Sequence, residues 1–146
     1  KSMYGEISCD GNHSTPAELH QLLEAKGPQY GMMVSDALMA KGSPAGSRFI
    51  FGGNEIEIYP DGSAHLTSTK GLAGSTLKVN EGLKVLVEKA LVPWDYAINA
   101  CTINPARLLK VDDRKGKLVA GYDADIVVLN DDYSVAQTSC KGKACL

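Results

Sequence analysis

The chain has 146 residues, of which 44% are hydrophobic and 22% are charged, and its formal net charge is -2. This is the composition of an ordinary globular domain, and the length is that of one domain of typical size. Lysine and arginine are scattered without an interleaved aromatic cluster, which argues against a nucleic-acid partner. No stretch approaches the roughly 20 apolar residues of a membrane-spanning helix, so no membrane partner is expected.

Cysteine usage and the N-terminal residues bear on the compartment. Residues 1–5 lack the apolar core of a secretory signal. The four cysteines, Cys9, Cys101, Cys140 and Cys145, form no CxxC pair. We therefore expect a cytoplasmic protein with reduced cysteines, in which Cys9 and Cys101 act as small core residues.

The first third of the chain has the pattern of a strand, a helix and a second strand. Residues 6–9 predict a short strand, and residues 15–18 form a capping box with proline at the first helical position. The helix is expected to stop at Gly27, and residues 32–35 to form the second strand. Strands joined in this way should be parallel neighbours. The apolar face of the helix is predicted to contain Leu19, Leu22 and Leu23.

The segment that follows has a different character. Residues 49–51, 55–59 and 64–66 predict short strands separated by turn sequences. Two glutamates alternate with two isoleucines in the middle strand, which is typical of a sheet with one wet face. This is antiparallel material inserted into an otherwise α/β chain.

The second half of the chain predicts helices and then strands. The Gly/Ser-rich residues 71–76 are expected to open a long helix, with Ser75 or Thr76 as its cap. Pro93 should start another helix, and Asn104 should cap a third short one over residues 106–109. The buried stripe of the long helix is predicted to be Leu83, Leu86, Val87, Ala90 and Leu91. Strands are expected over 126–129 and 135–140, with a turn at Lys141-Gly142.

Asp36 is the most informative single residue. It ends an apolar run. A buried strand with this pattern would place the carboxylate at its carboxyl end, where the active sites of α/β scaffolds lie. The alternative is that Asp36 only caps a turn, since aspartate is common after strands.

The Gly/Ser-rich loop at residues 71–76 also has two interpretations. Its main-chain amides could face an anionic or carbonyl oxygen, or the loop could simply start a helix.

His13 follows the end of the first strand. It could bond to a hydroxyl or phosphate, ligate a metal, or simply bond to the backbone. His20 and His65 are expected to be structural. A catalytic zinc site needs three protein ligands, and the chain has no HxH or HExxH motif. We therefore predict no metal ligand here, with Asp36 at most a weak one.

Five sequence blocks occur together in an order that resembles a known family. The chain is similar to the C-terminal portion of the N-acetylglucosamine-6-phosphate deacetylases, in the amidohydrolase superfamily, over nearly its whole length. The last block occurs in many amidohydrolases, whereas the first three are far more specific. The blocks are Asp10-Gly11-Asn12-His13, Val34-Ser35-Asp36-Ala37, Leu72-Ala73-Gly74-Ser75-Thr76-Leu77, Thr102-Ile103-Asn104-Pro105-Ala106 and Gly121-Tyr122-Asp123-Ala124-Asp125-Ile126-Val127-Val128.

The resemblance implies an α/β fold that is the C-terminal part of a (β/α)8 metal-dependent hydrolase barrel. The strands at 6–9 and 32–35 would be the last two barrel strands, and the tail would add strands to a small β-sandwich. A full barrel takes about 250 residues, so the remainder of the barrel is an expected partner. The implied division is 1–47 for the last βαβ part, 48–70 for a β-hairpin insertion, 71–118 for barrel helices and 119–146 for sandwich strands.

The resemblance also implies a reaction, the deacetylation of N-acetylglucosamine 6-phosphate to glucosamine 6-phosphate and acetate in amino-sugar catabolism. A divalent metal, zinc or iron, would activate water in the complete enzyme. Asp36 matches the catalytic aspartate, which takes the proton of the water and then protonates the leaving amine. The residues that match substrate-binding positions are Asp10, Gly11, Asn12, His13, Leu72, Ala73 and Gly74.

The family's metal ligands lie on earlier strands, so this chain alone is expected to bind no metal and to be inactive. A homodimer is expected for the enzyme. Two other interpretations stay open. One is a different amidohydrolase, of the cyclic-amidase or deaminase type, against which the first and third blocks argue. The other is a non-catalytic fragment in which Asp36 has no role.

Overall fold

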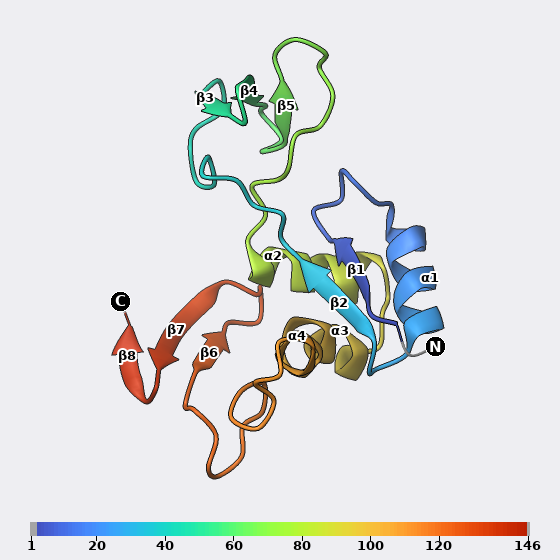
Figure 1. Ribbon diagram of the computed structural model, residues 1–146, viewed down its shortest axis with the longest axis vertical. Coiled ribbons are helices and arrows are strands. Elements are labelled where there is room, and N and C mark those ends of the chain that lie inside the picture. Colours follow the sequence, from blue (N-terminus) through green and yellow to red (C-terminus); the bar gives the residue numbers. More distant parts are fainter. Residues whose placement is uncertain (1–2, 146) are drawn as a thin grey trace.

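The computed structural model describes residues 3–145. Over these residues the chain forms three small sheets and a group of helices (Figure 1). The elements follow in the order β1 (Gly5–Ser8), α1 (Pro16–Lys26), β2 (Gly31–Val34), β3 (Arg48–Phe51), β4 (Asn54–Ile58), β5 (Ala64–Leu66), α2 (Val79–Lys84), the π-helix η1 (Val85–Lys89), α3 (Trp94–Cys101), α4 (Ile103–Leu108), β6 (Ile126–Leu129), β7 (Val135–Cys140) and β8 (Lys143–Cys145).

The first strand–helix–strand unit is confirmed. β1 and β2 pair in parallel from Gly5 opposite Gly31 to Ser8 opposite Val34, each strand beginning one residue earlier than predicted. The predicted capping box starts α1, because the Thr15 hydroxyl accepts from the Glu18 amide at 3.3 Å and the Glu18 carboxylate accepts from the Thr15 amide at 2.7 Å. On the apolar face of α1, Leu19 and Leu23 are buried and Leu22 is half-buried.

The prediction that residues 71–76 open a helix is wrong. These residues form isolated β-bridges at Leu72 and Ser75 with a bend at Gly74, and α2 begins only at Val79, after Lys78, which gives no side-chain cap. The physical reason lies in Ser75, whose hydroxyl bonds to the carbonyl of Ser35 and to the amide of Leu77 and so is not free to cap a helix. Leu83, Leu86 and Ala90 form the buried stripe, whereas Leu91 is 72% exposed and Val87 is half-buried.

Of the two short helices that follow, α3 begins where the sequence predicts and α4 does not. α3 begins directly after Pro93, as expected. α4 begins at Ile103, three residues earlier than predicted, and Asn104 lies inside its first turn instead of capping it. Asn104 is fully buried, and its side-chain amide donates to the main-chain carbonyls of Pro28 and Gly31. A long-range bond has therefore replaced the local cap that the sequence favoured.

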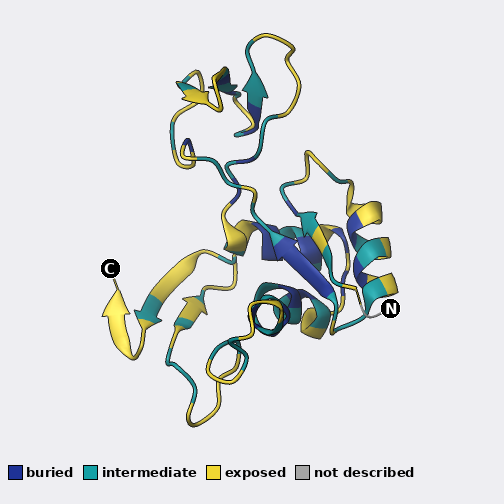
Figure 2. Cartoon of the chain, in the orientation of Figure 1, coloured by how far each residue is buried: buried dark blue, intermediate teal, exposed yellow. Residues whose placement is uncertain are grey.

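The main core lies between the parallel pair and the helices. Figure 2 shows the buried residues concentrated in β2 and in the helices around it. Cys9 is part of this core, as predicted, and Cys101 is partly buried against it. All four cysteines are free. The buried members of the core are Cys9, Leu19, Leu23, Met33, Leu77, Leu83, Leu86, Ala90, Val92, Ala97 and Ala100.

The two remaining sheets are antiparallel. Strands β3, β4 and β5 pair in sequence order and stand apart from the main body in Figure 1. Ile56 and Ile58 are buried, whereas Glu55 and Glu57, which alternate with them, are half-buried, so the predicted wet face is confirmed. β6, β7 and β8 form the C-terminal sheet, whose third strand, after the turn at Lys141-Gly142, was not predicted.

The fold is thus a mixed α/β structure. Among the residues described, no helix is both long and apolar enough to cross a membrane. The division of the chain into four parts at residues 47, 70 and 118 stays a prediction, although the helices themselves are confined to 79–108 in the second half.

A candidate active site at the carboxyl ends of two parallel strands

The loop after β1 is organised by one buried carboxylate. Asp10 accepts hydrogen bonds from the main-chain amides of Asn12 and His13, both at 3.0 Å. Its second oxygen accepts from the ring Nδ1 of His13 at 2.7 Å. Gly11 has φ +79°, the left-handed backbone that closes so tight a turn. The Asp10 side chain is 8% exposed and that of His13 is 30% exposed, so the histidine is the member of the pair that reaches solvent.

These contacts decide the charge of Asp10 and the orientation of His13. Burial raises the pKa of Asp10, but the amides of His13 and Asn12 and the His13 ring outweigh burial and hold the pKa below its ordinary value. Asp10 is therefore a carboxylate at neutral pH. Because a carboxylate cannot donate, Nδ1 of His13 carries the hydrogen, and Nε2 is left for another partner.

Asp36 follows β2 at the same edge of the sheet. It is exposed and has φ +49°, a left-handed conformation that few residues other than glycine adopt. Ser8 and Val34 are paired across the two strands, and Asp10 and Asp36 each come two residues after that pair. Since parallel strands end at the same edge, the structure brings the Asp10–His13 loop and Asp36 to one edge, where α/β folds bind ligands.

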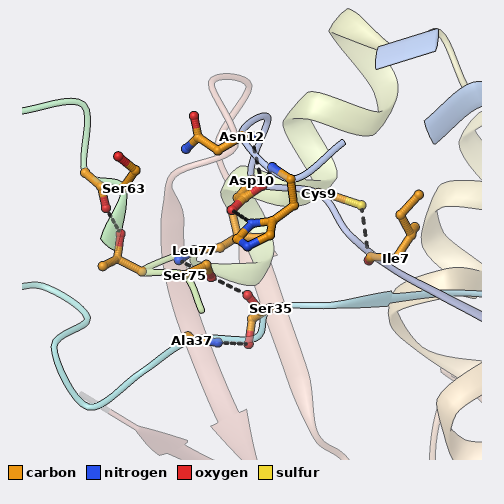
Figure 3. A network of polar contacts seen from close by, with 12 residues as sticks. Ile7, Cys9, Asp10, Asn12, Ser35, Ala37, Ser63, Ser75 and Leu77 are labelled. Carbon is orange, nitrogen blue, oxygen red and sulfur yellow. Dashed lines mark hydrogen bonds and ion pairs between the residues drawn. The ribbon is translucent and has the colours of Figure 1, made fainter. Parts of the chain in front are cut away.

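The loop at residues 72–77 joins the same place from far along the chain. Ser75 pairs with Ala37 in a parallel bridge, and its amide donates to the carbonyl of Asp36 at 2.8 Å. Gly74 lies so close that a Cβ there would approach the Asp36 carbonyl to 3.1 Å. Figure 3 shows Ser75 beside Ser35 and Ala37. All three specific sequence blocks therefore converge on one end of the sheet.

The other two members of the predicted substrate loop face different neighbours. The Ala73 amide donates to the Ala64 carbonyl at 2.9 Å, so this residue is tied to the hairpin sheet. Leu72 is 38% exposed and forms a bridge with His65. The loop thus runs from the hairpin sheet to Asp36.

His20 and His65, which are predicted to be structural, each bond to a main-chain carbonyl. His20 Nδ1 lies 2.8 Å from the Ala90 carbonyl. His65 lies between the Ser63 hydroxyl at 2.9 Å and the Lys70 carbonyl at 2.8 Å. Each ring therefore bonds to its own surroundings, while the main chain of His65 pairs with Leu72 of the 72–77 loop.

Ser75 is the site residue whose role the sequence misassigned. Its place in a Gly/Ser-rich stretch before a helix favoured a cap, and no local signal marks a bond to a residue 40 positions away. The structure instead makes Ser75 the link between the two loops, 2% exposed and bonded on both sides.

The donors present do not fit a hydrolytic metal by themselves. Over residues 3–145, no three His, Cys, Asp or Glu side chains lie close enough to hold a metal ion. His13 Nε2 and the Asp36 carboxylate are the ligand types near the site, and a catalytic zinc normally takes three protein ligands.

Comparison with known proteins gives consistent matches. A family model described as the amidohydrolase family matches residues 13–145. N-acetylglucosamine-6-phosphate deacetylase from Bacillus subtilis (strain 168) is 36% identical over 137 residues, which cover 94% of this chain and 34% of the relative. A putative N-acetylgalactosamine-6-phosphate deacetylase from Escherichia coli (strain K12) is 33% identical over 143 residues, which cover 98% of this chain and 83% of the relative.

Solved structures agree with the sequence matches. A variant of N-acetyl-D-glucosamine-6-phosphate deacetylase from Mycobacterium smegmatis, in complex with N-acetyl-D-glucosamine 6-phosphate, superposes with a TM-score of 0.88 at 28% identity. The match covers 97% of this chain and 37% of that one. The chain therefore spans about a third of the length of the Bacillus relative and of this structure, and most of the Escherichia relative. The resemblance noted in the sequence is confirmed.

Proposed function

The chain belongs to the amidohydrolase family, among relatives of N-acetylglucosamine-6-phosphate deacetylase, and on that basis we propose that it is the C-terminal portion of an enzyme that deacetylates N-acetylglucosamine 6-phosphate. The products would be glucosamine 6-phosphate and acetate. One observation carries the proposal: Asp36, the Asp10–His13 loop and the 72–77 loop meet at the carboxyl end of β1 and β2.

Asp36 is proposed as the group that moves the proton. Amide hydrolysis adds water to the acetyl carbonyl, and the nitrogen can leave only if it gains a proton. A carboxylate can accept the proton from water and return it to the amine, which keeps the proton count balanced across the reaction. Asp36 is exposed at the strand end, where it can reach a bound substrate.

The two loops are proposed to hold the substrate. His13 has its Nδ1 fixed by Asp10, so its outer ring nitrogen can bond to the sugar phosphate or a sugar hydroxyl. Leu72, Ala73 and Gly74 are proposed to line the acetyl end. Gly74 supports this because it lies against the Asp36 carbonyl, and Leu72 and Ala73 continue the loop from there toward the hairpin sheet. Their apolar side chains suit a methyl group.

The metal that amidohydrolases use would need ligands from other residues, because those described here do not make a site. We propose that zinc or iron is held by the barrel strands that longer relatives carry outside the matched region. β1 and β2 would then be barrel strands seven and eight. Within residues 3–145 each has one unpaired edge, which further strands would cover. The buried Ser8 hydroxyl at the end of β1, which has no partner among these residues, is consistent with an incomplete enclosure.

A second candidate substrate is the galacto epimer, N-acetylgalactosamine 6-phosphate. The specific observation in its favour is the Escherichia coli relative named for that sugar, which is matched over 83% of its own length. Both substrates carry the same acetamide and the same phosphate. Asp36 and His13 would therefore have the same roles with either sugar.

The test is acetate release from each sugar phosphate by the polypeptide as it occurs in the cell, assayed with zinc or iron(II) added. We expect turnover of one of them and, in Asp36→Asn, a loss of about 10²–10⁴ in kcat. Asp95→Asn, an exposed aspartate on α3, is the control and should keep activity. Turnover of a cyclic amide such as dihydroorotate would establish the other amidohydrolase interpretation, and the absence of any hydrolysis would support the non-catalytic one.

A further inference from the structure

The backbone around Asp36 is joined to the 72–77 loop on both sides of the aspartate. The Ser75 amide donates to the Asp36 carbonyl at 2.8 Å, and the Leu38 amide donates to the Ser75 carbonyl at 2.8 Å. The Ser75 hydroxyl adds two more bonds, since it donates to the Ser35 carbonyl and accepts from the Leu77 amide at 3.0 Å. Ser75 thus contacts the chain before, at and after Asp36.

Asp36 needs such support because of its own conformation. Its φ of +49° lies in the left-handed region, which is sparsely populated for residues with a side chain. A residue held there persists only where the surrounding structure over-determines it, and such residues cluster at functional sites. β2 ends at Val34, so the β1–β2 ladder does not hold Asp36. This stretch is held by the contacts to Ser75 and by the Ala37 amide, which donates to the Ser35 hydroxyl at 3.3 Å.

Gly74 shows how closely the two segments approach. A Cβ at this position would come within 2.8 Å of two Leu38 side-chain carbons and within 3.1 Å of the Asp36 carbonyl. Its φ is +61°, which suits glycine. The absence of a side chain at Gly74 therefore lets Ser75 reach the aspartate's main chain.

We propose that the Ser75 hydroxyl is a positioning group for Asp36, holding the left-handed backbone that presents the carboxylate. The inference rests on the proposed function for the catalytic role of the Asp36 carboxylate. The hydrogen bonds by which Ser75 holds the backbone do not depend on that role. Ser75 touches neither substrate nor reacting atoms in this scheme. Its effect passes through the main chain of Ser35 and Asp36.

The experiment compares Ser75→Ala with Ser63→Ala by NMR. Ser63 is the matched control, because it is also buried and its hydroxyl also makes two hydrogen bonds. Its partners are the side chains of Asp61 and His65, away from Asp36. The readouts are hydrogen exchange of the Leu38 amide and the ¹³C shift of the Asp36 carboxyl group at pH 7. Ser75→Cys, which has the same shape with a slightly larger atom but only a weak S–H donor, is used if Ser75→Ala does not fold.

In Ser75→Ala we expect the Leu38 amide to exchange about tenfold faster, the effect of losing one or two buried hydrogen bonds. The ¹³C shift of the Asp36 carboxyl group should move, while amides within β2 keep their protection. Ser63→Ala should change neither readout. Unchanged Leu38 exchange and an unchanged Asp36 carboxyl ¹³C shift in Ser75→Ala would overturn the proposal, and so would an equal loss of protection throughout the molecule.

The two proposals fail in different ways. If Ser75→Ala shifts the Asp36 signals but Asp36→Asn keeps full deacetylase activity, the positioning role stands and the catalytic role falls. If Asp36→Asn is inactive while Ser75→Ala leaves the Asp36 signals unchanged, the catalytic role stands and the positioning role falls. A lower kcat in Ser75→Ala, with activity recovered in Ser75→Thr, would support both.

Discussion

The side-chain amide of Asn104 donates hydrogen bonds to the main-chain carbonyls of Gly31, at 2.9 Å, and Pro28, at 3.1 Å. Gly31 is the first residue of the strand that leads to Asp36, and Asn104 lies in the first turn of α4. The side chain is fully buried, and its oxygen accepts from Arg107 at 3.3 Å. One asparagine therefore fixes the start of β2 against a helix more than 70 residues away in sequence.

Asn104→Ala is expected to destabilise the fold by about 1–3 kcal/mol, because it leaves buried carbonyls without their donor. Asn99→Ala is the control, since Asn99 also donates to the Pro28 carbonyl, at 3.2 Å, but is only half-buried. Urea unfolding of both variants measures the difference. A loss in Asn99→Ala as large as that in Asn104→Ala would contradict the role given to the Gly31 bond.

Gly116 packs against the junction of α3 and α4. A Cβ there would lie 2.8 Å from Ile103 Cα and 3.1 Å from the Thr102 carbonyl oxygen, and φ is +89°. Gly121 has a similar φ of +91° but open space around it. Both alanine variants should lose about 1–2 kcal/mol from the left-handed backbone. Gly116→Ala should lose a further ~1–3 kcal/mol from the clash, as measured by thermal unfolding. Equal losses in the two variants would show that the close packing is not needed.

The pH dependence of stability should reveal Asp10. Its pKa is lower in the folded protein than in the unfolded chain, because the His13 and Asn12 amides and the His13 ring outweigh the opposing effect of burial. Such a group stabilises the fold above its unfolded pKa of about 4 and loses that contribution as pH falls through the folded pKa. The stability gap between wild type and Asp10→Asn should therefore be full at pH 6 and shrink below pH ~4.

The matched variant for this measurement is His13→Ala. It removes the ring but keeps both main-chain amides on the Asp10 carboxylate, so most of the pH dependence should remain. Unfolding curves from pH 3 to pH 7 give both comparisons. A gap for Asp10→Asn that stays constant over this range would rule out the lowered pKa.

The four thiols should separate into two reactivity classes. Burial raises the pKa of Cys9 and of Cys101 to about 12, so neither forms thiolate at neutral pH. Cys140 and Cys145 are exposed. Labelling with a disulfide reagent at pH 8 should modify two thiols quickly and the other two only in urea. Cys140→Ser should leave one thiol that reacts quickly. Rapid labelling of three or four thiols in the native protein would contradict the burial of Cys9 and Cys101.

Much of the fold can be predicted where the signal is local. Thr15 and Glu18 lie three residues apart, so their capping box is visible in the sequence and is confirmed. The alternation around Ile56 and Ile58 likewise depends only on neighbouring residues. The positions of the Asp10–His13 loop and of Asp36 at one edge of the sheet can be predicted because each follows a strand, and the catalytic role of Asp36 stays a prediction.

The sequence by itself determined the periodic elements, the parallel pairing of β1 and β2, the family and the candidate residues, because each depends on short-range patterns or recognisable blocks. Only the tertiary structure decided the roles of Ser75 and Asn104, which sequence rules read as helix caps. Both side chains satisfy carbonyls 40 or more residues away. A buried main-chain carbonyl costs free energy unless it finds a donor, and that demand outweighs the small advantage of a local cap.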